Sequence, residues 1–128
     1  PAGIQGKATQ FVMILDALQL RLLEKIRSDL AGYSVVRSTS PLDNRAIWLE
    51  IFAGGIHKGN SCQTLLKKLN INCKEVAGLG NDYNDIDFLD ICAEAYLVAN
   101  APVNLQRHYK LVKSDKEEGF TEFISKVL

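Results

Sequence analysis

The 128-residue sequence has no excess charge and no long apolar run. Its 15 basic and 15 acidic residues cancel, so no net positive field exists to attract nucleic acid or an anionic membrane. The longest apolar run, at residues 11–15, is far too short to cross a bilayer. From these two absences we expect no nucleic-acid partner and no membrane partner.

Cysteine is also scarce in this chain. Cys62, Cys73 and Cys92 show no CxxC spacing, and an odd number of cysteines argues against a disulfide framework. Free thiols indicate a reducing, cytoplasmic setting. Apolar residues make up 47% of the chain and charged residues 23%, which is the balance of an ordinary globular protein.

The first part of the chain, residues 1–56, predicts a small α/β layer with the order β-α-β-β. A continuous apolar run is typical of a buried strand, and apolar side chains then recur at every fourth position, which predicts an amphipathic helix. The strands are expected at residues 11–15, 33–38 and 46–52, with a turn at 40–44. The predicted apolar stripe of the helix consists of Leu18, Leu22, Ile26 and Leu30.

The second part, residues 57–128, alternates short apolar runs with amphipathic segments. This α-β-α-β-α-β-α order predicts a parallel sheet of three strands with helices on both faces. The first of these helices is expected to be capped at Asn60 and Ser61. The three strands are expected at residues 76–80, 95–99 and 111–112.

The polar loop at residues 81–85, with the sequence NDYND, follows the first of these strands directly. In open α/β sheets, ligands bind beyond the carboxyl ends of the strands. Two carboxylates and two amides at that place offer hard oxygen ligands, which suit Mg²⁺. An ordinary turn followed by a helix N-cap is the alternative, because Asn and Asp favour both.

Several motifs of the second part occur in a familiar order. Lys58-Gly59 precedes a helix, GNDYNDIDFLD follows at 80–90, then come VANAP at 98–102 and Glu118-Gly119. This pattern, over residues 45–128, resembles the haloacid dehalogenase superfamily, and most closely its phosphatases with a large α/β cap, the Cof-type group. The resemblance implies that residues 1–56 form part of that cap. It implies that residues 57–128 form the carboxyl-terminal half of the Rossmannoid core.

The resemblance also implies a mechanism. In the family an Asp nucleophile forms an aspartyl-phosphate, which water hydrolyses, while Mg²⁺ and a Lys offset the phosphoryl charge. Carried over by position, Lys58 and Asp85 would be catalytic, and a phosphorylated small molecule would be the substrate. Lys58, Asn84 and Asn100 would contact it, and Asn81, Asp82 and Asp85 would serve the metal. Without the resemblance, Lys58 reads as a solvated loop lysine and Asn100 as an ordinary helix opener.

Two departures from the family pattern stand out. Asn81 occupies a place where the family usually writes Asp, so either Asp82 takes over as ligand or metal binding is weakened, since an amide oxygen has no net charge. The opening DxDx[T/V] motif is absent, because the candidate Asp85-Ile86-Asp87 continues with Phe88-Leu89. We therefore expect the carboxyl-terminal portion of a longer phosphatase.

Without that motif the chain alone is expected to be inactive. Its partner would be the missing amino-terminal half or a second copy of the chain. A catalytically silent half-fold that binds metal, phosphate or another protein is the alternative function.

Asp16, at the end of the first predicted strand, has two interpretations. An apolar strand ending in Asp can present a nucleophilic carboxylate. The second acid expected two residues later is replaced by Leu18, and the predicted helix begins at once. The pattern therefore favours Asp16 as a helix cap.

Overall fold

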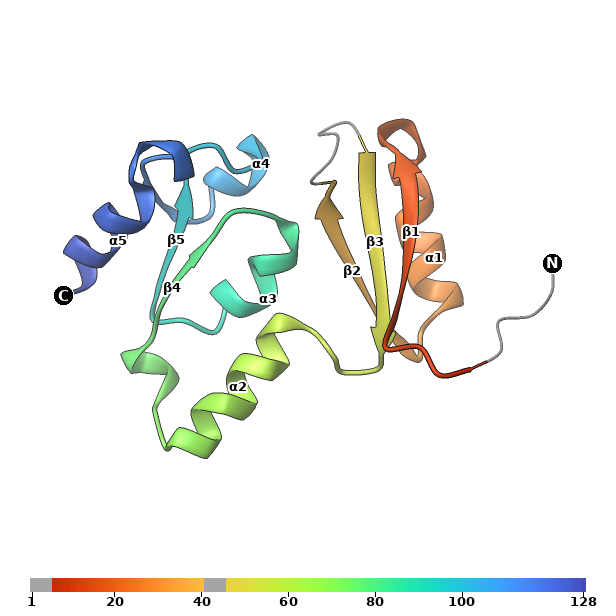
Figure 1. Ribbon diagram of the computed structural model, residues 1–128, viewed down its shortest axis with the longest axis horizontal. Coiled ribbons are helices and arrows are strands. Elements are labelled where there is room, and N and C mark those ends of the chain that lie inside the picture. Colours follow the sequence, from red (N-terminus) through yellow and green to blue (C-terminus); the bar gives the residue numbers. More distant parts are fainter. Residues whose placement is uncertain (1–5, 41–45) are drawn as a thin grey trace. The chain divides into compact units, whose positions relative to one another are not determined.

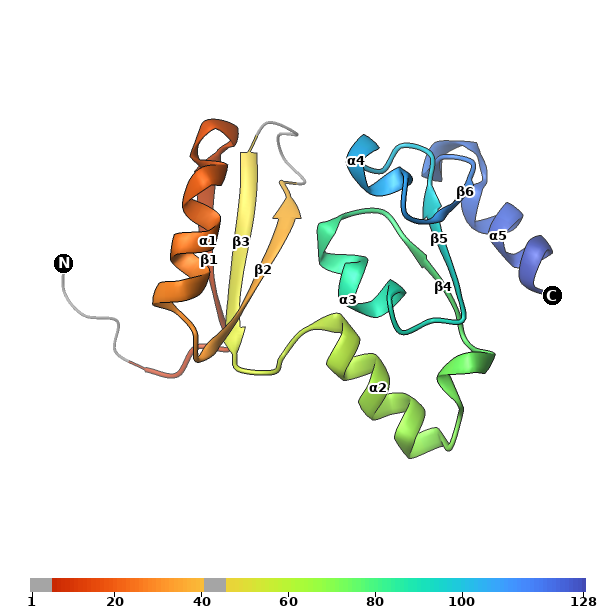
Figure 2. The same ribbon diagram turned by 180° about the vertical axis from the view of Figure 1, so that it is seen from behind.

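The structure is a computed structural model that describes residues 6–40 and 46–128. These residues belong to two compact units, Pro1–Ile56 and His57–Leu128, which Figures 1 and 2 show from opposite sides. Most of the turn predicted at 40–44 lies outside the described residues.

The first unit is a three-stranded antiparallel sheet with helical turns beside it (Figure 1). Strands β1 (Gln10–Asp16), β2 (Tyr33–Thr39) and β3 (Ala46–Ala53) pair in the order β1-β3-β2. A 3-10 helix (Ala17–Leu22) leads into α1 (Leu23–Asp29). The alternation of side chains along β3 places Ile47 and Leu49 in the core of this unit, whose buried hydrophobic residues are Leu15, Leu23, Ile47 and Leu49.

The apolar stripe predicted for the helix is wrong in its first half. Leu18 is 87% exposed, whereas Leu20, Leu23 and Ile26, which are three residues apart, face the core. The reason is that residues 17–22 form a 3-10 helix, whose period is three residues per turn and not 3.6. Asp16 accepts a hydrogen bond from the Leu18 N–H (2.9 Å) within a capping box, which confirms its interpretation as a cap.

The prediction that the first strand is buried is also wrong. Strand β1 forms as predicted, but residues 11–14 are between 39% and 64% exposed, and only Leu15 is buried. Since β1 lies at the edge of its sheet and pairs only with β3, few side chains are available to cover it. The apolar run therefore identified a strand but not its burial.

The second unit contains the predicted parallel sheet. Strands β4 (Ala77–Gly80), β5 (Glu94–Val98) and β6 (Lys110–Val112) pair in parallel in the order β4-β5-β6. Parallel strands require crossover connections, which helices supply. The α-helices of this unit are α2 (Lys58–Leu69), α3 (Ile86–Leu89), α4 (Val103–Gln106) and α5 (Gly119–Val127).

Helices cover both faces of this sheet, as predicted. Leu79 and Tyr96 are register partners and share a face, and Phe123 of α5 contacts the Tyr96 ring edge-on at 5.4 Å between centroids. A Cβ added to Gly78, on the other face, would lie 3.2 Å from the Leu89 side chain of α3. Figures 1 and 2 accordingly show α3 and α5 on opposite sides of β4 and β5.

Helix α2 begins earlier than the sequence predicted. Its first residue is Lys58, and its N-cap is His57, whose side chain makes no capping hydrogen bond. The capping pattern at Asn60 and Ser61 therefore does not mark the start. Consequently, Lys58 lies on a helix of twelve residues and not in a loop. No helix in the described part of the chain has the length and apolar character needed to cross a membrane.

Replacing Leu97 with alanine should destabilise the second unit strongly. Leu97 lies on the central strand β5 and is completely buried, so the truncation leaves a cavity that costs about 3 kcal/mol. Leu111→Ala, on the neighbouring strand β6, is the matched control, because that side chain is 43% exposed and its loss should cost less than about 1 kcal/mol. Chemical denaturation measures both free energies of unfolding. Equal losses for the two variants would contradict the assignment of the core.

Candidate functional site

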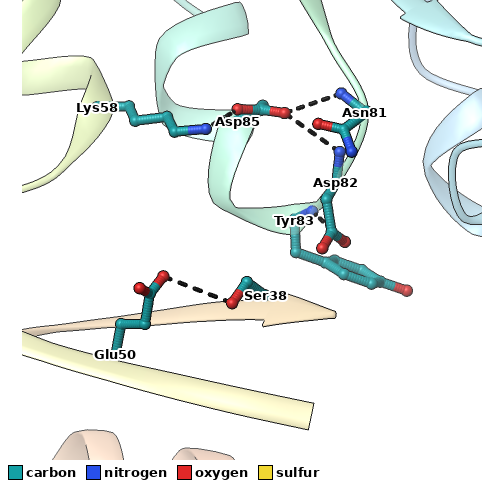
Figure 3. Close-up of polar contacts among 7 residues, drawn as sticks. All are labelled: Ser38, Glu50, Lys58, Asn81, Asp82, Tyr83 and Asp85. Atoms are coloured by element: carbon teal, nitrogen blue, oxygen red, sulfur yellow. Dashed lines mark hydrogen bonds and ion pairs between the residues drawn. The ribbon is translucent and has the colours of Figure 1, made fainter. Parts of the chain in front are cut away.

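Asp85 is the centre of a connected polar cluster in the second unit (Figure 3). It is buried, and its Oδ2 atom accepts the backbone N–H groups of Asn81 (2.8 Å) and Asp82 (3.2 Å). Its Oδ1 atom forms an ion pair with the Lys58 ammonium. Both carboxylate oxygens therefore have partners, which is what an ionised group needs when it is removed from water.

The local backbone explains how Asp85 reaches this position. Strand β4 ends at Gly80, and Asp82 caps a 3-10 turn (Tyr83–Asp85) by accepting the Tyr83 N–H at 2.7 Å. The turn folds Asp85 back over the end of the strand. A Cβ at Gly80 would lie 2.8 Å from the Asp85 Cβ, so the absence of a side chain there allows the close approach.

Lys58 supplies the positive charge of the site from the first turn of α2. Its side chain is 52% exposed, while that of Asp85 is 7% exposed. The ammonium therefore contacts the buried carboxylate on one side and solvent on the other, so it can bind an anion that approaches from solvent. Because Lys58 and Asp85 are 27 residues apart in sequence, only the tertiary fold brings them together.

The other predicted residues of the loop differ in their surroundings. The Asn84 Oδ1 atom is buried and has no hydrogen-bond partner among the described residues. Asn81 is exposed, whereas Asp82 is buried. Figure 3 shows the Asp82 carboxylate turned away from that of Asp85 and toward the Tyr83 backbone. The two acids of the loop thus do not converge on one point.

These donors suit a hard cation in kind but are few in number. Asn84 Oδ1 is a buried oxygen that needs a partner, and Asp85 supplies a carboxylate beside it in sequence. However, no group of three or more His, Cys, Asp or Glu side chains in residues 6–40 and 46–128 converges as a metal site. Amide and carboxylate oxygens of this kind fit Mg²⁺, which completes its octahedron with water or other groups.

Asn100, the remaining predicted residue, is committed elsewhere. Its amide donates to Asp115 Oδ1 (2.7 Å), and its Oδ1 accepts the Asp115 N–H (3.3 Å). This reciprocal pair ties the end of β5 to the loop that precedes α5. In the described part of the chain, Asn100 makes no hydrogen bond with the loop at 81–85.

Two contacts near the site were not predicted. The Tyr83 hydroxyl donates to Asn104 Oδ1 at 2.7 Å, which anchors the loop to α4. His57 Nδ1 lies 2.9 Å from Asp87 Oδ2, which joins the start of α2 to α3. Local sequence patterns could not predict either contact, because each joins residues more than twenty positions apart.

Known proteins match most of this chain. The model of a family described as haloacid dehalogenase-like hydrolase matches residues 4–124. A protein of Streptococcus pyogenes serotype M6, a phosphatase by name, is 27% identical over 95 residues, which is 73% of this chain and 33% of that protein. The chain thus spans about a third of the length of the curated relatives it matches.

Solved structures share the fold. The SMU.1108c protein of Streptococcus mutans superposes with a TM-score of 0.76 at 24% identity, over 92% of this chain and 44% of that one. The subclass IIB sugar phosphatase BT4131 superposes with a TM-score of 0.74 at 14% identity, over 91% and 42%. At these identities the likeness concerns the fold, and the chemistry has to be argued from the residues.

Proposed function

Because the chain belongs to the haloacid dehalogenase-like hydrolase family, we propose that it is the carboxyl-terminal part of a magnesium-dependent phosphomonoesterase. In this proposal residues 1–56 are part of the cap and residues 57–128 are the carboxyl-terminal half of the core. The substrate is a phosphorylated small molecule. Three free cysteines in the described residues agree with a cytoplasmic setting.

The observation that carries this proposal is the Lys58–Asp85 pair at the carboxyl end of β4. Parallel α/β sheets bind ligands at that edge. A half-exposed ammonium can contact a phosphoryl oxygen as a compact point charge. Asp85 keeps the ammonium near the end of the strand, and the backbone N–H groups of Asn81 and Asp82 keep Asp85 in place.

The metal ligands in this proposal are Asp85, through the one lone pair that its three bonds leave on Oδ1, and Asn84, together with either Asn81 or Asp82. When bound, Mg²⁺ supplies charge that offsets the negative phosphoryl group. Asn84 contributes a buried amide oxygen that lacks another partner among the described residues. The capping bond from the Tyr83 N–H to Asp82 favours Asn81 as the remaining ligand, because moving Asp82 would break that cap.

The nucleophile is the part of the reaction that this chain does not supply. Asp85 is engaged through both oxygens, Asp82 caps the Tyr83 turn, and Asp16 caps the 3-10 helix of the first unit. We therefore propose that an amino-terminal segment carrying DxDx[T/V] completes the enzyme. Until that segment is present, β4 is an edge strand, and a second copy of the chain can cover it instead.

Replacing Asn81 with aspartate tests the metal site. If Asn81 is a ligand, the added carboxylate should tighten Mg²⁺ binding on the order of tenfold, because affinity for hard cations rises with ligand charge. Isothermal titration calorimetry measures both dissociation constants. Asn72→Asp, which makes the same charge change at the cap of another turn, should leave the affinity unchanged.

Two outcomes of this titration would revise the assignment. Equal affinities for the wild-type and Asn81→Asp chains would make Asp82 the ligand. If neither protein binds Mg²⁺ at millimolar concentration, the loop is not a metal site and the proposal of a magnesium-dependent enzyme fails.

A further inference from the structure

The start of helix α2 contacts one short segment of the chain through three successive residues. Lys58 forms its ion pair with Asp85. His57 Nδ1 lies 2.9 Å from Asp87 Oδ2, and Gly59 packs on the Asp87 backbone. Since Asp85 and Asp87 lie two residues apart at the start of α3, the contacts of His57 and Gly59 are placed to control where Lys58 points.

Gly59 sets the distance between the two helices. It is buried, and a Cβ at this position would lie 2.6 Å from the Asp87 carbonyl oxygen and 2.9 Å from the Asp87 Cβ. Real Cβ atoms do not come so close to backbone oxygen, so only glycine permits this separation. The backbone of α2 next to Lys58 is therefore held directly against α3.

His57 adds a side-chain contact on the other side of Lys58. Its Nδ1 atom is buried and faces the Asp87 carboxylate at 2.9 Å, although the alignment is not that of a hydrogen bond. As the N-cap residue, His57 could bond to its own helix, but it makes no such bond. Its imidazole is used for the contact with α3 instead.

We propose that His57 is a positioning residue that, through Asp87, fixes the first turn of α2 on α3 and so holds the Lys58 ammonium at Asp85. A lysine side chain has a flexible four-carbon stem, and at 52% exposure its own packing cannot hold it in one place. Clamping the backbone on both sides of Lys58 restricts the positions that its ammonium can reach. This positioning role depends on the proposed function in one respect only, which is the catalytic role of the Lys58–Asp85 ion pair.

The test reads the Lys58 ammonium directly. Lysine-labelled chain is studied by NMR, and the Lys58 Cε and Nζ resonances are assigned by their loss in Lys58→Ala. Asp85→Asn gives the resonance position of a Lys58 without its ionised partner. The His57→Ala substitution should move the Lys58 resonances most of the way to that position. Asp87→Ala should do the same, whereas Asp87→Asn, which keeps an oxygen facing His57, should stay close to wild type.

His108→Ala is the matched control, because His108 is the other histidine of the chain and is exposed. It should leave the Lys58 resonances unmoved. If His57→Ala fails to fold, as judged by circular dichroism, His57→Gln and Asp87→Ala provide the comparison. Lys58 resonances that stay at the wild-type position in folded His57→Ala (or His57→Gln) and Asp87→Ala chains would overturn the proposal.

The measurement separates this proposal from the proposed function, since it needs neither metal nor substrate. Addition of inorganic phosphate to the same samples tests the function. A wild-type chain that shows no response to phosphate, while His57→Ala still displaces Lys58, would leave the positioning role intact and count against the phosphatase assignment.

Discussion

Replacing Asp85 with asparagine should abolish Mg²⁺-dependent turnover by the complete enzyme. The substitution keeps the size of the side chain, and the amide oxygen can still accept the N–H groups of Asn81 and Asp82. It removes the charge that holds Lys58 and weakens a hard-cation site. We expect a loss of at least about two to three orders of magnitude in kcat, as for other groups that stabilise developing charge. Steady-state hydrolysis of an aryl phosphate measures this effect.

The variant should nevertheless fold. Because Lys58 is half exposed, water can hydrate its ammonium once the buried charge of Asp85 is gone, and the loss of the ion pair should cost about 1–3 kcal/mol. Asp29→Asn is a matched control that removes a charge from an exposed ion pair with Lys25 in the first unit, and it should leave turnover unchanged. Wild-type turnover by the Asp85→Asn enzyme would show that Asp85 is not part of the site.

The purified chain alone should not hydrolyse phosphomonoesters at an enzyme-like rate. Its site holds charge, but each of the three acids considered as nucleophile, Asp16, Asp82 and Asp85, is engaged in a cap or an ion pair. Covalent catalysis needs a positioned and available nucleophile. Electrostatic groups alone give about 10³–10⁴-fold acceleration over water in enzymes that lose their catalytic residues, against at least about 10⁶-fold for complete enzymes.

The absence of turnover is informative only if the chain is folded. Far-ultraviolet circular dichroism and the unfolding transition of the same sample provide that control. Turnover at an enzyme-like rate would require a nucleophile within the chain. If Asp16→Asn then abolished it, Asp16 would be that nucleophile, and its interpretation as a cap would be incomplete.

The second unit was the more predictable half of the fold. Its strands are short apolar runs separated by amphipathic segments, and that alternation allows few arrangements besides a parallel sheet. The first unit shows where such patterns mislead. An α-helical period predicts Leu18 on the apolar stripe, but a 3-10 helix turns it to solvent. The run at 11–15 predicted burial, but a sheet of three strands leaves β1 at an edge.

The site was predictable in its loop but not in its geometry. Acidic and amide residues after β4 predict a ligand site from sequence alone, whereas the role proposed for Lys58 depends on the family resemblance. The helix start at Lys58 was hidden because Asn60 and Ser61 looked like better caps than His57. The contact of His57 with Asp87 depends on the packing of α2 against α3, which no local pattern in either segment reports.

Reconstitution is the most direct test of the central claim that this chain supplies the Lys58–Asp85 half of a phosphatase site. The chain is mixed with a separately produced polypeptide that carries the proposed upstream segment with DxDx[T/V], and hydrolysis of an aryl phosphate is followed with Mg²⁺ present. We predict turnover only in the mixture, and its loss when the Asp85→Asn chain replaces the wild type. Turnover by either polypeptide alone, or a mixture with the Asp85→Asn chain that is as active as wild type, would contradict the claim.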